Sequence, residues 1–203
     1  MKKLRFSLLS LAVAAALLLP ALPARAEGLE LTAPSAVLME ASTGRVLFEK
    51  DPHALRSCAS ITKVMTLCLV FEAIDSGRLS LDQTLTASAH AASMGGSDIW
   101  LEEGEAMSVD DLIKATVIMS ANDAAVVLAE AVSGSEDAFV AQMNARAKEL
   151  GCTDTTFSCV HGLYDYGNVS TAEDLAKIAA ACYANETYMQ AANTLTYTLP
   201  ATN

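Results

Sequence analysis

The stretch Ala59-Ser60-Ile61-Thr62-Lys63-Val64-Met65-Thr66 opens the strongest helical pattern in the chain. Apolar residues recur at helical spacing as far as Phe71, and Gly77 follows as a stop signal. We therefore predict a helix over residues 60–75. Ser60 and Lys63 are three residues apart, so this helix places the hydroxyl and the amine on one face.

This pair of residues can form a nucleophile and its base. Serine is a poor nucleophile by itself, and a lysine amine made neutral by desolvation can accept its proton. The helix N-terminus favours negative charge near Ser60, and the Ser60 backbone N–H there can donate to an oxyanion. The spacing alone is weak evidence, since this composition gives about 0.6 chance matches to S-x-x-K. The alternative is a serine cap followed by a solvated lysine.

A second polar motif, Ser120-Ala121-Asn122, lies between two predicted helices. Ser108 and Asp111 resemble a capping box that opens the first helix, and Asp123 can cap the second. A short corner of this kind can aim a hydroxyl and a carboxamide into a cleft. The hydroxyl can relay a proton, and the amide can hold a peptide backbone. The alternative is that Asn122 or Asp123 is only a helix cap.

The remaining chain predicts a mixed α/β fold with one domain. Residues 35–39 and 45–50 are β-prone runs around a turn at residues 41–44, which predicts a hairpin. Residues 79–104 read as loops with short extended pieces. Helices are expected over residues 135–150 and from Ser170 or Thr171 to about residue 184. An isolated hairpin is marginal in water, so we expect further strands.

The N-terminus predicts export. Residues 1–26 combine Lys2, Lys3 and Arg5, an apolar run and an Ala24-Arg25-Ala26 end, which is typical of a signal peptide. Residues 27–203 then form the exported chain, outside the cytoplasm. Removal of the four cations of the signal changes the formal net charge from −11 to −15. Such acidity makes nucleic acid an unsuitable partner.

The five cysteines, Cys58, Cys68, Cys152, Cys159 and Cys182, are an odd number at irregular spacings. This excludes a full disulfide framework, and most of them are expected to be small buried residues. Cys152 with Cys159 is the one near pair that we consider as a bridge. The spacing of cysteines and histidines predicts no metal site, and no cofactor is expected.

Several residues compete weakly with the Ser60 and Lys63 pair. His161 suggests a Ser-His catalytic pair. However, this histidine is expected in a loop far from Ser60 in sequence, so a structural role is favoured for it. Cys58 is a rival nucleophile for which no base is suitably spaced. Trp100 is expected either to line a cleft or to pack in the core.

Taken together, these segments resemble the D-alanyl-D-alanine carboxypeptidases, the low-molecular-mass penicillin-binding proteins of the serine β-lactamase and DD-transpeptidase superfamily. The resemblance covers nearly all of residues 34–203. It rests on the two motifs above and on two further segments in the order of the family, Gly77-Arg78-Leu79-Ser80 and His161-Gly162-Leu163. It implies the α/β fold of that superfamily, represented here by an N-terminal hairpin and a helical region.

The resemblance also implies a reaction, in which Ser60 attacks the penultimate D-Ala carbonyl of a peptidoglycan pentapeptide ending in D-Ala-D-Ala. D-Ala leaves, and water releases the shortened peptide from the acyl-enzyme. Lys63 is then the general base, Ser120 the proton relay and Asn122 a ligand of the substrate amide. β-Lactam antibiotics are expected to acylate Ser60. Membrane association is expected only through a C-terminal segment of the kind that family members often carry.

One feature of the family is missing from the chain. No lysine is followed by Thr-Gly or Ser-Gly, so the Lys-Thr/Ser-Gly motif and the later strands of the sheet are expected beyond Asn203. We expect the 203-residue piece alone to be inactive. A serine β-lactamase is an alternative function, although no Glu-x-x-x-Asn element is present to activate a deacylating water. A non-catalytic peptidoglycan-binding or regulatory module is an alternative of another class.

Overall fold

The computed structural model describes residues 30–163 and 167–200. The predicted signal peptide, residues 1–26, lies outside the described residues. The chain divides after Thr32, and the unit Ala33–Asn203 contains all of the helices and strands given below.

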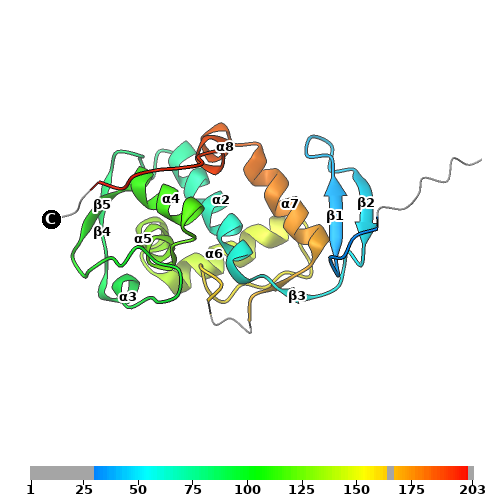
Figure 1. Cartoon of the computed structure of the whole chain (residues 1–203), viewed down its shortest axis with the longest axis horizontal. Helices are drawn as coiled ribbons and strands as arrows, with labels where there is room; N and C mark the ends of the chain where they lie inside the picture. The colour runs from blue at the N-terminus through cyan, green and yellow to red at the C-terminus, as the bar shows by residue number, and fades with distance from the viewer. Residues whose placement is uncertain (1–29, 164–166, 201–203) are drawn as a thin grey trace, which may run out of the picture. The chain divides into compact units, whose positions relative to one another are not determined.

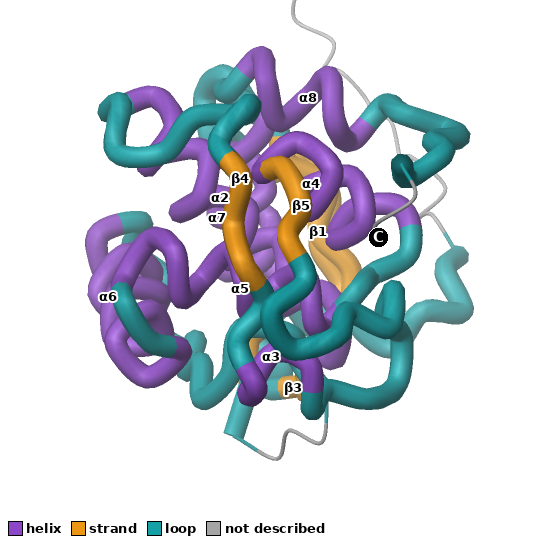
Figure 2. The backbone as a smooth tube through the Cα atoms, turned by 90° about the vertical axis from the view of Figure 1, so that its left-hand side faces the viewer, coloured by secondary structure: helices purple, strands orange, loops and turns teal. Residues whose placement is uncertain are grey.

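Helix α2, Thr62–Asp75, forms the centre of this unit (Figures 1 and 2). Ten of its fourteen residues are buried, and it packs against four other helices. This burial confirms the predicted helix, which starts with a short 3-10 turn, η1, at Ala59–Ile61. The surrounding helices are α4 Val109–Ile118, α5 Asn122–Ser133, α6 Glu136–Glu149, α7 Ala172–Tyr183 and α8 Glu186–Ala192.

Side-chain caps fix where most of these helices begin. Ser108, Ser135 and Thr171 each accept a hydrogen bond from the backbone N–H three residues later, at 3.1 to 3.2 Å. Such caps satisfy donors that a helix start leaves open, and these three confirm the predicted boundaries. Asn185 caps α8 in the same way, at 2.8 Å, although the sequence analysis did not predict that helix.

The predicted hairpin is confirmed. Strands β1, Ala36–Met39, and β2, Val46–Lys50, pair antiparallel with Leu38 opposite Phe48. Their turn contains Gly44 at φ +70°, a conformation that glycine adopts without a steric cost.

The other strands in the described part of the chain form two small ribbons that do not join the hairpin. Strand β3, Arg56–Ser57, pairs with β6, Val169–Ser170, and β4, Thr84–Thr86, pairs with β5, Ala106–Ser108. The region predicted as loops also contains a short helix, α3, Ala89–Ala92. None of the helices in the described ranges has both the length and the apolar composition that crossing a membrane requires.

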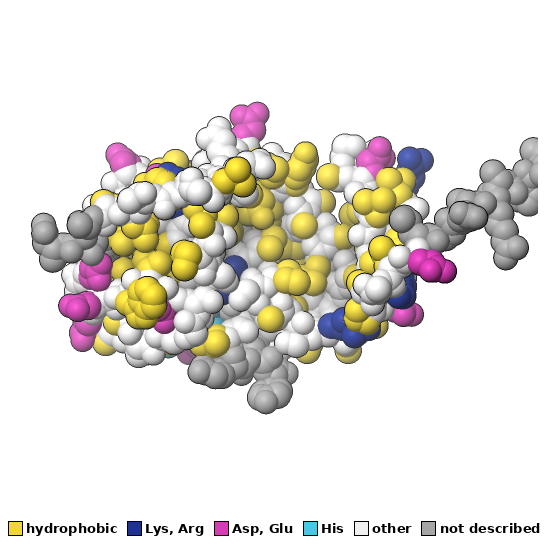
Figure 3. Space-filling view, viewed as in Figure 1, with side chains coloured by type: hydrophobic (Ala, Val, Ile, Leu, Met, Phe, Trp, Pro, Cys, Tyr) yellow, Lys and Arg dark blue, Asp and Glu magenta, His cyan; other side chains and the backbone are white. Residues whose placement is uncertain are grey.

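The hairpin contacts α7, and an apolar groove of about 310 Å³ lies between them. Its wall includes Val37, Met39, Ala176 and Ala180, and the exposed Tyr183 lies at its edge. Figure 3 shows that apolar side chains gather widely over this face of the molecule. The hydrophobic surface of the hairpin is therefore only partly covered by α7.

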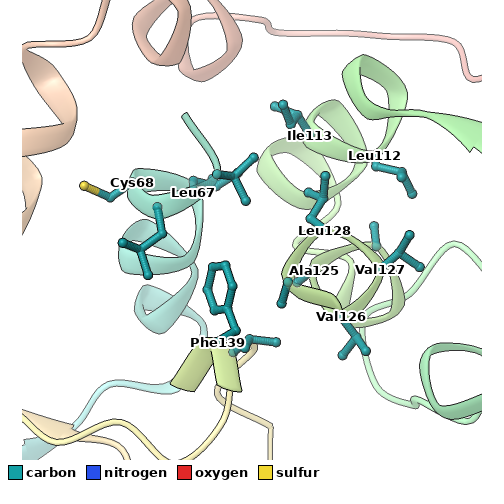
Figure 4. Packing of buried hydrophobic residues seen from close by; sticks show 14 of the residues in the cluster. Leu67, Cys68, Leu112, Ile113, Ala125, Val126, Val127, Leu128 and Phe139 are labelled. Carbon is teal, nitrogen blue, oxygen red and sulfur yellow. The ribbon is translucent and has the colours of Figure 1, made fainter. Parts of the chain in front are cut away.

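The main core lies between α2, α4, α5 and α6 (Figure 4). Phe139 on α6 is fully buried, as are Val126 and Leu128 on α5. Such close packing leaves little room for a large side chain to be removed without a cavity. The core therefore fixes the position of α2, which begins next to the predicted nucleophile.

We expect Phe139→Ala to destabilise the protein by about 3–5 kcal/mol, because it removes a buried ring and leaves a cavity between α2 and α5. Leu47→Ala, on the exposed side of β2, is the control and should change stability by less than about 0.5 kcal/mol. Urea unfolding of both variants measures the difference. Equal loss of stability in the two variants would contradict the assignment of Phe139 to the core.

Candidate active site

Ser60 lies in the turn that leads directly into α2. The preceding residue, Ala59, has φ +44°, a region that residues other than glycine rarely occupy. Strain of this kind persists only where surrounding contacts hold it, and it is frequent at functional sites. Ser60 is exposed, whereas the rival nucleophile Cys58 is only 2% exposed. The accessible nucleophile in this segment is therefore the serine.

The Lys63 amine is buried beside Ser60. The residue is 4% exposed, and Nζ lies 3.5 Å from Ser60 Oγ. It also donates to Asn122 Oδ1 at 2.7 Å and to the backbone carbonyl of His161 at 2.8 Å. Burial lowers the pKa of the Lys63 amine from its ordinary 10.5 to about 8, while the nearby Cys159 thiol acts in the opposite direction. A substantial fraction of the amine is then neutral near pH 8 and able to accept a proton.

The Ser120-Ala121-Asn122 corner faces this amine. Ser120 has φ +56° and separates α4 from α5. The Asn122 amide donates from Nδ2 to the Gly95 carbonyl at 2.7 Å, and this contact turns Oδ1 toward Lys63. The backbone N–H of Asn122 is bound by the Ser97 carbonyl, also at 2.7 Å. The amide orientation is therefore set by the segment that follows α3.

The alternative in which this corner is only a helix cap is wrong. The cap of α5 is Ala121, which has no capping side chain, and Asp123 is the second residue of the helix. The buried Asp123 carboxylate accepts the first-turn N–H of Ala124 at 2.8 Å, and it also accepts the backbone N–H groups of Ile99 and Leu101, at 3.1 to 3.2 Å. It holds a loop that would otherwise carry unpaired donors.

Trp100, between those two residues, is 81% exposed at φ +57°. The expected core role for its side chain is therefore wrong. Its expected place in the lining of a cleft stays a prediction.

A cavity of about 170 Å³ adjoins the site. Ser60, Lys63 and Ser120 contribute to its wall, together with Tyr188 and Ala192 from α8. Ser120 Oγ is buried and has no hydrogen-bond partner among the described residues. A buried hydroxyl without a partner is costly, so this oxygen is ready to bond an incoming group. The contribution of α8 was missed, although Asn185 could have marked its start.

The loop at residues 158–163 closes the other side of Lys63. The His161 imidazole accepts the Leu163 N–H at Nδ1, at 2.9 Å, and its Nε2 lies 3.6 Å from a carboxylate oxygen of Glu136. The ring therefore has structural contacts, as expected, and the histidine reaches the site through its backbone carbonyl. Neighbouring Gly162 has φ +80°, and a Cβ there would lie 1.9 Å from the Ala59 carbonyl oxygen.

Asn168, which is fully buried, links this loop to the nucleophile segment. Its side chain donates to Thr62 Oγ1 at 2.9 Å and accepts the backbone N–H of Ser158 at 2.5 Å. Its backbone carbonyl accepts the Cys58 N–H at 3.3 Å. The residues on both sides of Ser60 are therefore held by one asparagine. No motif in the sequence indicated a role for Asn168.

The remaining candidates have other roles. Cys152 is a buried thiol that contacts the Asp174 carbonyl at 3.4 Å and forms no disulfide, so the bridge to Cys159 is absent. Burial raises the pKa of the Cys152 thiol to about 11. Over residues 30–163 and 167–200, no three His, Cys, Asp or Glu side chains are grouped to hold a metal ion.

Comparison with known proteins assigns the chain to a family. The family described as D-alanyl-D-alanine carboxypeptidase matches residues 22–199. The chain belongs to this family. The D-alanyl-D-alanine carboxypeptidase DacF of Bacillus subtilis (strain 168) is 48% identical over 147 residues, which are 72% of this chain and 38% of the relative. DacC of Escherichia coli (strain K12) is 39% identical over 151 residues, 71% of this chain and 38% of the relative.

Solved structures agree with this membership. The D-alanyl-D-alanine carboxypeptidase DacD from Francisella tularensis matches with a TM-score of 0.80 and 34% identity, over 88% of this chain and 44% of that one. Penicillin binding protein 6B from Escherichia coli matches with a TM-score of 0.78 and 36% identity, over 84% of this chain and 56% of that one. The expected fold of the superfamily is confirmed. The chain spans about two-fifths of the length of these curated carboxypeptidase relatives.

Gly162→Ala should destabilise the protein far more than Gly134→Ala. An alanine in left-handed backbone costs about 1–2 kcal/mol, which both variants incur, and the loss of stability in the Gly162 variant should be several times larger than this. The two glycines have φ +80° and +82°. A Cβ at residue 162 would collide with the backbone of Ala59, whereas a Cβ at residue 134 would have no heavy atom within 4 Å. Thermal unfolding of the two variants measures the difference. Similar melting temperatures would show that the contact with Ala59 is not tight.

Proposed function

We propose that the protein containing this chain is a serine-type D-Ala-D-Ala carboxypeptidase that trims peptidoglycan stem peptides. The observation that carries the proposal is the buried Lys63 amine, 3.5 Å from Ser60 Oγ, with its pKa lowered to about 8. An amine in this state can take the proton of a serine that attacks a carbonyl. The names of the relatives indicate the substrate class.

The first half of the reaction forms an ester. Ser60 Oγ attacks the carbonyl carbon of the penultimate D-Ala, and its proton passes to Lys63 Nζ. The amide C–N bond then breaks, and the leaving nitrogen takes a proton relayed from Lys63 through the unpartnered hydroxyl of Ser120. The free D-Ala departs and leaves an acyl-enzyme on Ser60. The backbone N–H of Ser60 is proposed as one oxyanion donor.

The second half uses water. Lys63 accepts a proton from a water molecule that attacks the ester, and the shortened peptide leaves as Ser60 regains its proton. We assign Asn122 to the substrate amide as well as to Lys63. Its Oδ1 and Nδ2 already contact Lys63 and Gly95, but an amide has two lone pairs and two N–H donors, so one of each is available.

Peptidoglycan and β-lactams lie outside the cytoplasm, so the proposal includes export through a signal peptide at residues 1–26. Penicillin is proposed to acylate Ser60 as a mimic of the dipeptide. Peripheral membrane association through a C-terminal segment, as in the family, is part of the proposal.

Ser60→Ala in the complete protein should abolish labelling by a fluorescent penicillin and the release of D-Ala, because it removes the oxygen that is proposed to form the acyl bond. Lys63→Ala should lower the acylation rate by about 10²- to 10⁴-fold, since the base is lost. The control is Ser57→Ala, an exposed serine of β3 three residues earlier, which should label normally. Labelling of the Ser60 variant would refute the assignment of the nucleophile.

The same assay separates the alternatives. Rapid turnover of the penicilloyl-enzyme would indicate a β-lactamase. Binding of peptidoglycan fragments without D-Ala release, retained in the Ser60→Ala variant, would indicate a non-catalytic module.

The acylation rate should rise with pH and level off above about pH 8. Lys63 acts as a base only when its amine is neutral, and the neutral fraction grows as the pH passes the lowered pKa. Stopped-flow measurement of the acylation rate from about pH 6 to about pH 9 tests this rise. A rate that falls over this range would show that the ammonium form of Lys63 is the active one.

A further inference from the structure

The Lys63 amine makes two short hydrogen bonds, and the positions of their two acceptors depend on two segments that are far apart in sequence. The His161 carbonyl is in the loop at residues 158–163, and Asn122 Oδ1 is turned by the Gly95 carbonyl, in the segment just after α3. The amine can keep both contacts only while both segments keep their positions. What fixes the two segments relative to each other is therefore important for the site.

One carboxylate contacts both segments. Glu136 is the first residue of α6, and its side chain is 14% exposed. Its Oε1 accepts the Val160 backbone N–H at 3.0 Å, directly before His161 in the chain. Its Oε2 contacts Nε2 of His90, on α3, at 2.7 Å. The two oxygens of one side chain thus join the 158–163 loop to the helix that precedes Gly95.

The His161 ring adds a third contact to this arrangement. Its Nδ1 accepts the Leu163 N–H, which places the proton of the neutral ring on Nε2, 3.6 Å from Glu136 Oε1. The carboxylate also lies in the first turn of α6, where the helix dipole favours a negative charge. Glu136 itself has no contact with Ser60 or Lys63 among the hydrogen bonds of the described residues.

We propose that Glu136 is a positioning residue for the reaction, which holds the His161 carbonyl and the Gly95 segment so that Lys63 faces Ser60. The proposal rests on the proposed function of Lys63 as the base. Truncation of Glu136 frees the Val160 N–H and His90 together, and small displacements of a catalytic group are costly to the rate.

Acylation of the complete protein by a fluorescent penicillin tests this proposal with three variants. Glu136→Ala should slow acylation by about ten- to a hundredfold. Glu136→Gln should stay within about threefold of the native rate, because the amide oxygen can still accept the Val160 N–H and the amide NH2 can donate to Nε2 of His90 in the tautomer that carries its proton on Nδ1. Asp137→Asn is the control, because it removes a charge from the same helical turn at an exposed side chain, and it should leave the rate unchanged.

Native acylation by Glu136→Ala would overturn the proposal, and so would a Glu136→Gln variant as slow as the alanine variant. A crystal structure of Glu136→Ala gives a test that does not depend on activity. The distance from Lys63 Nζ to the His161 carbonyl should exceed hydrogen-bonding range, and a distance still near 2.8 Å would overturn the proposal. If the native protein is not acylated, the proposed function fails. The crystal structure of Glu136→Ala then decides by itself whether Glu136 positions the His161 carbonyl.

Discussion

The burial of one amine at the start of α2 is the constraint on which the rest of the site depends. Taking a lysine out of water is costly, and the cost is reduced when its N–H groups find acceptors. Lys63 finds them 59 and 98 residues further along the chain, in Asn122 and the His161 carbonyl. The corner between α4 and α5 and the 158–163 loop must therefore meet at the first turn of α2. The same burial produces the lowered pKa that suits a base.

Backbone strain follows the same constraint. Two of the four non-glycine residues with positive φ in the described ranges are Ala59, directly before the nucleophile, and Ser120, at the facing corner. Gly162 packs its backbone against Ala59 so closely that no side chain fits. Strained backbone is stable only where surrounding contacts determine it fully, and Asn168 supplies such contacts on both sides of Ser60. Ser60 is thus held in place by contacts within the chain itself.

Much of the helical region was predictable because its signals are local. Ser108, Ser135 and Thr171 cap helices where the sequence indicated, and the hairpin turn at Gly44 was identified by its glycine. Local reasoning failed where a polar residue had two possible partners. Asp123 looked like a helix cap, but besides the N–H of Ala124 its carboxylate also accepts from the distant 99–101 loop. A short-range pattern cannot show whether such a carboxylate also accepts from distant N–H donors.

The sequence by itself determined the choice of Ser60 and Lys63 as a candidate nucleophile and base. It also determined the candidate corner at Ser120-Ala121-Asn122 and the resemblance to the family, because all of these depend on residue type and short spacing. Only the tertiary structure decided which groups surround the Lys63 amine. The His161 and Gly95 groups are backbone carbonyls, and Glu136 bonds a backbone N–H, so no side-chain pattern marks these contacts. The physical reason is that burial and hydrogen-bond partners are properties of packed segments, which become neighbours only when the chain folds.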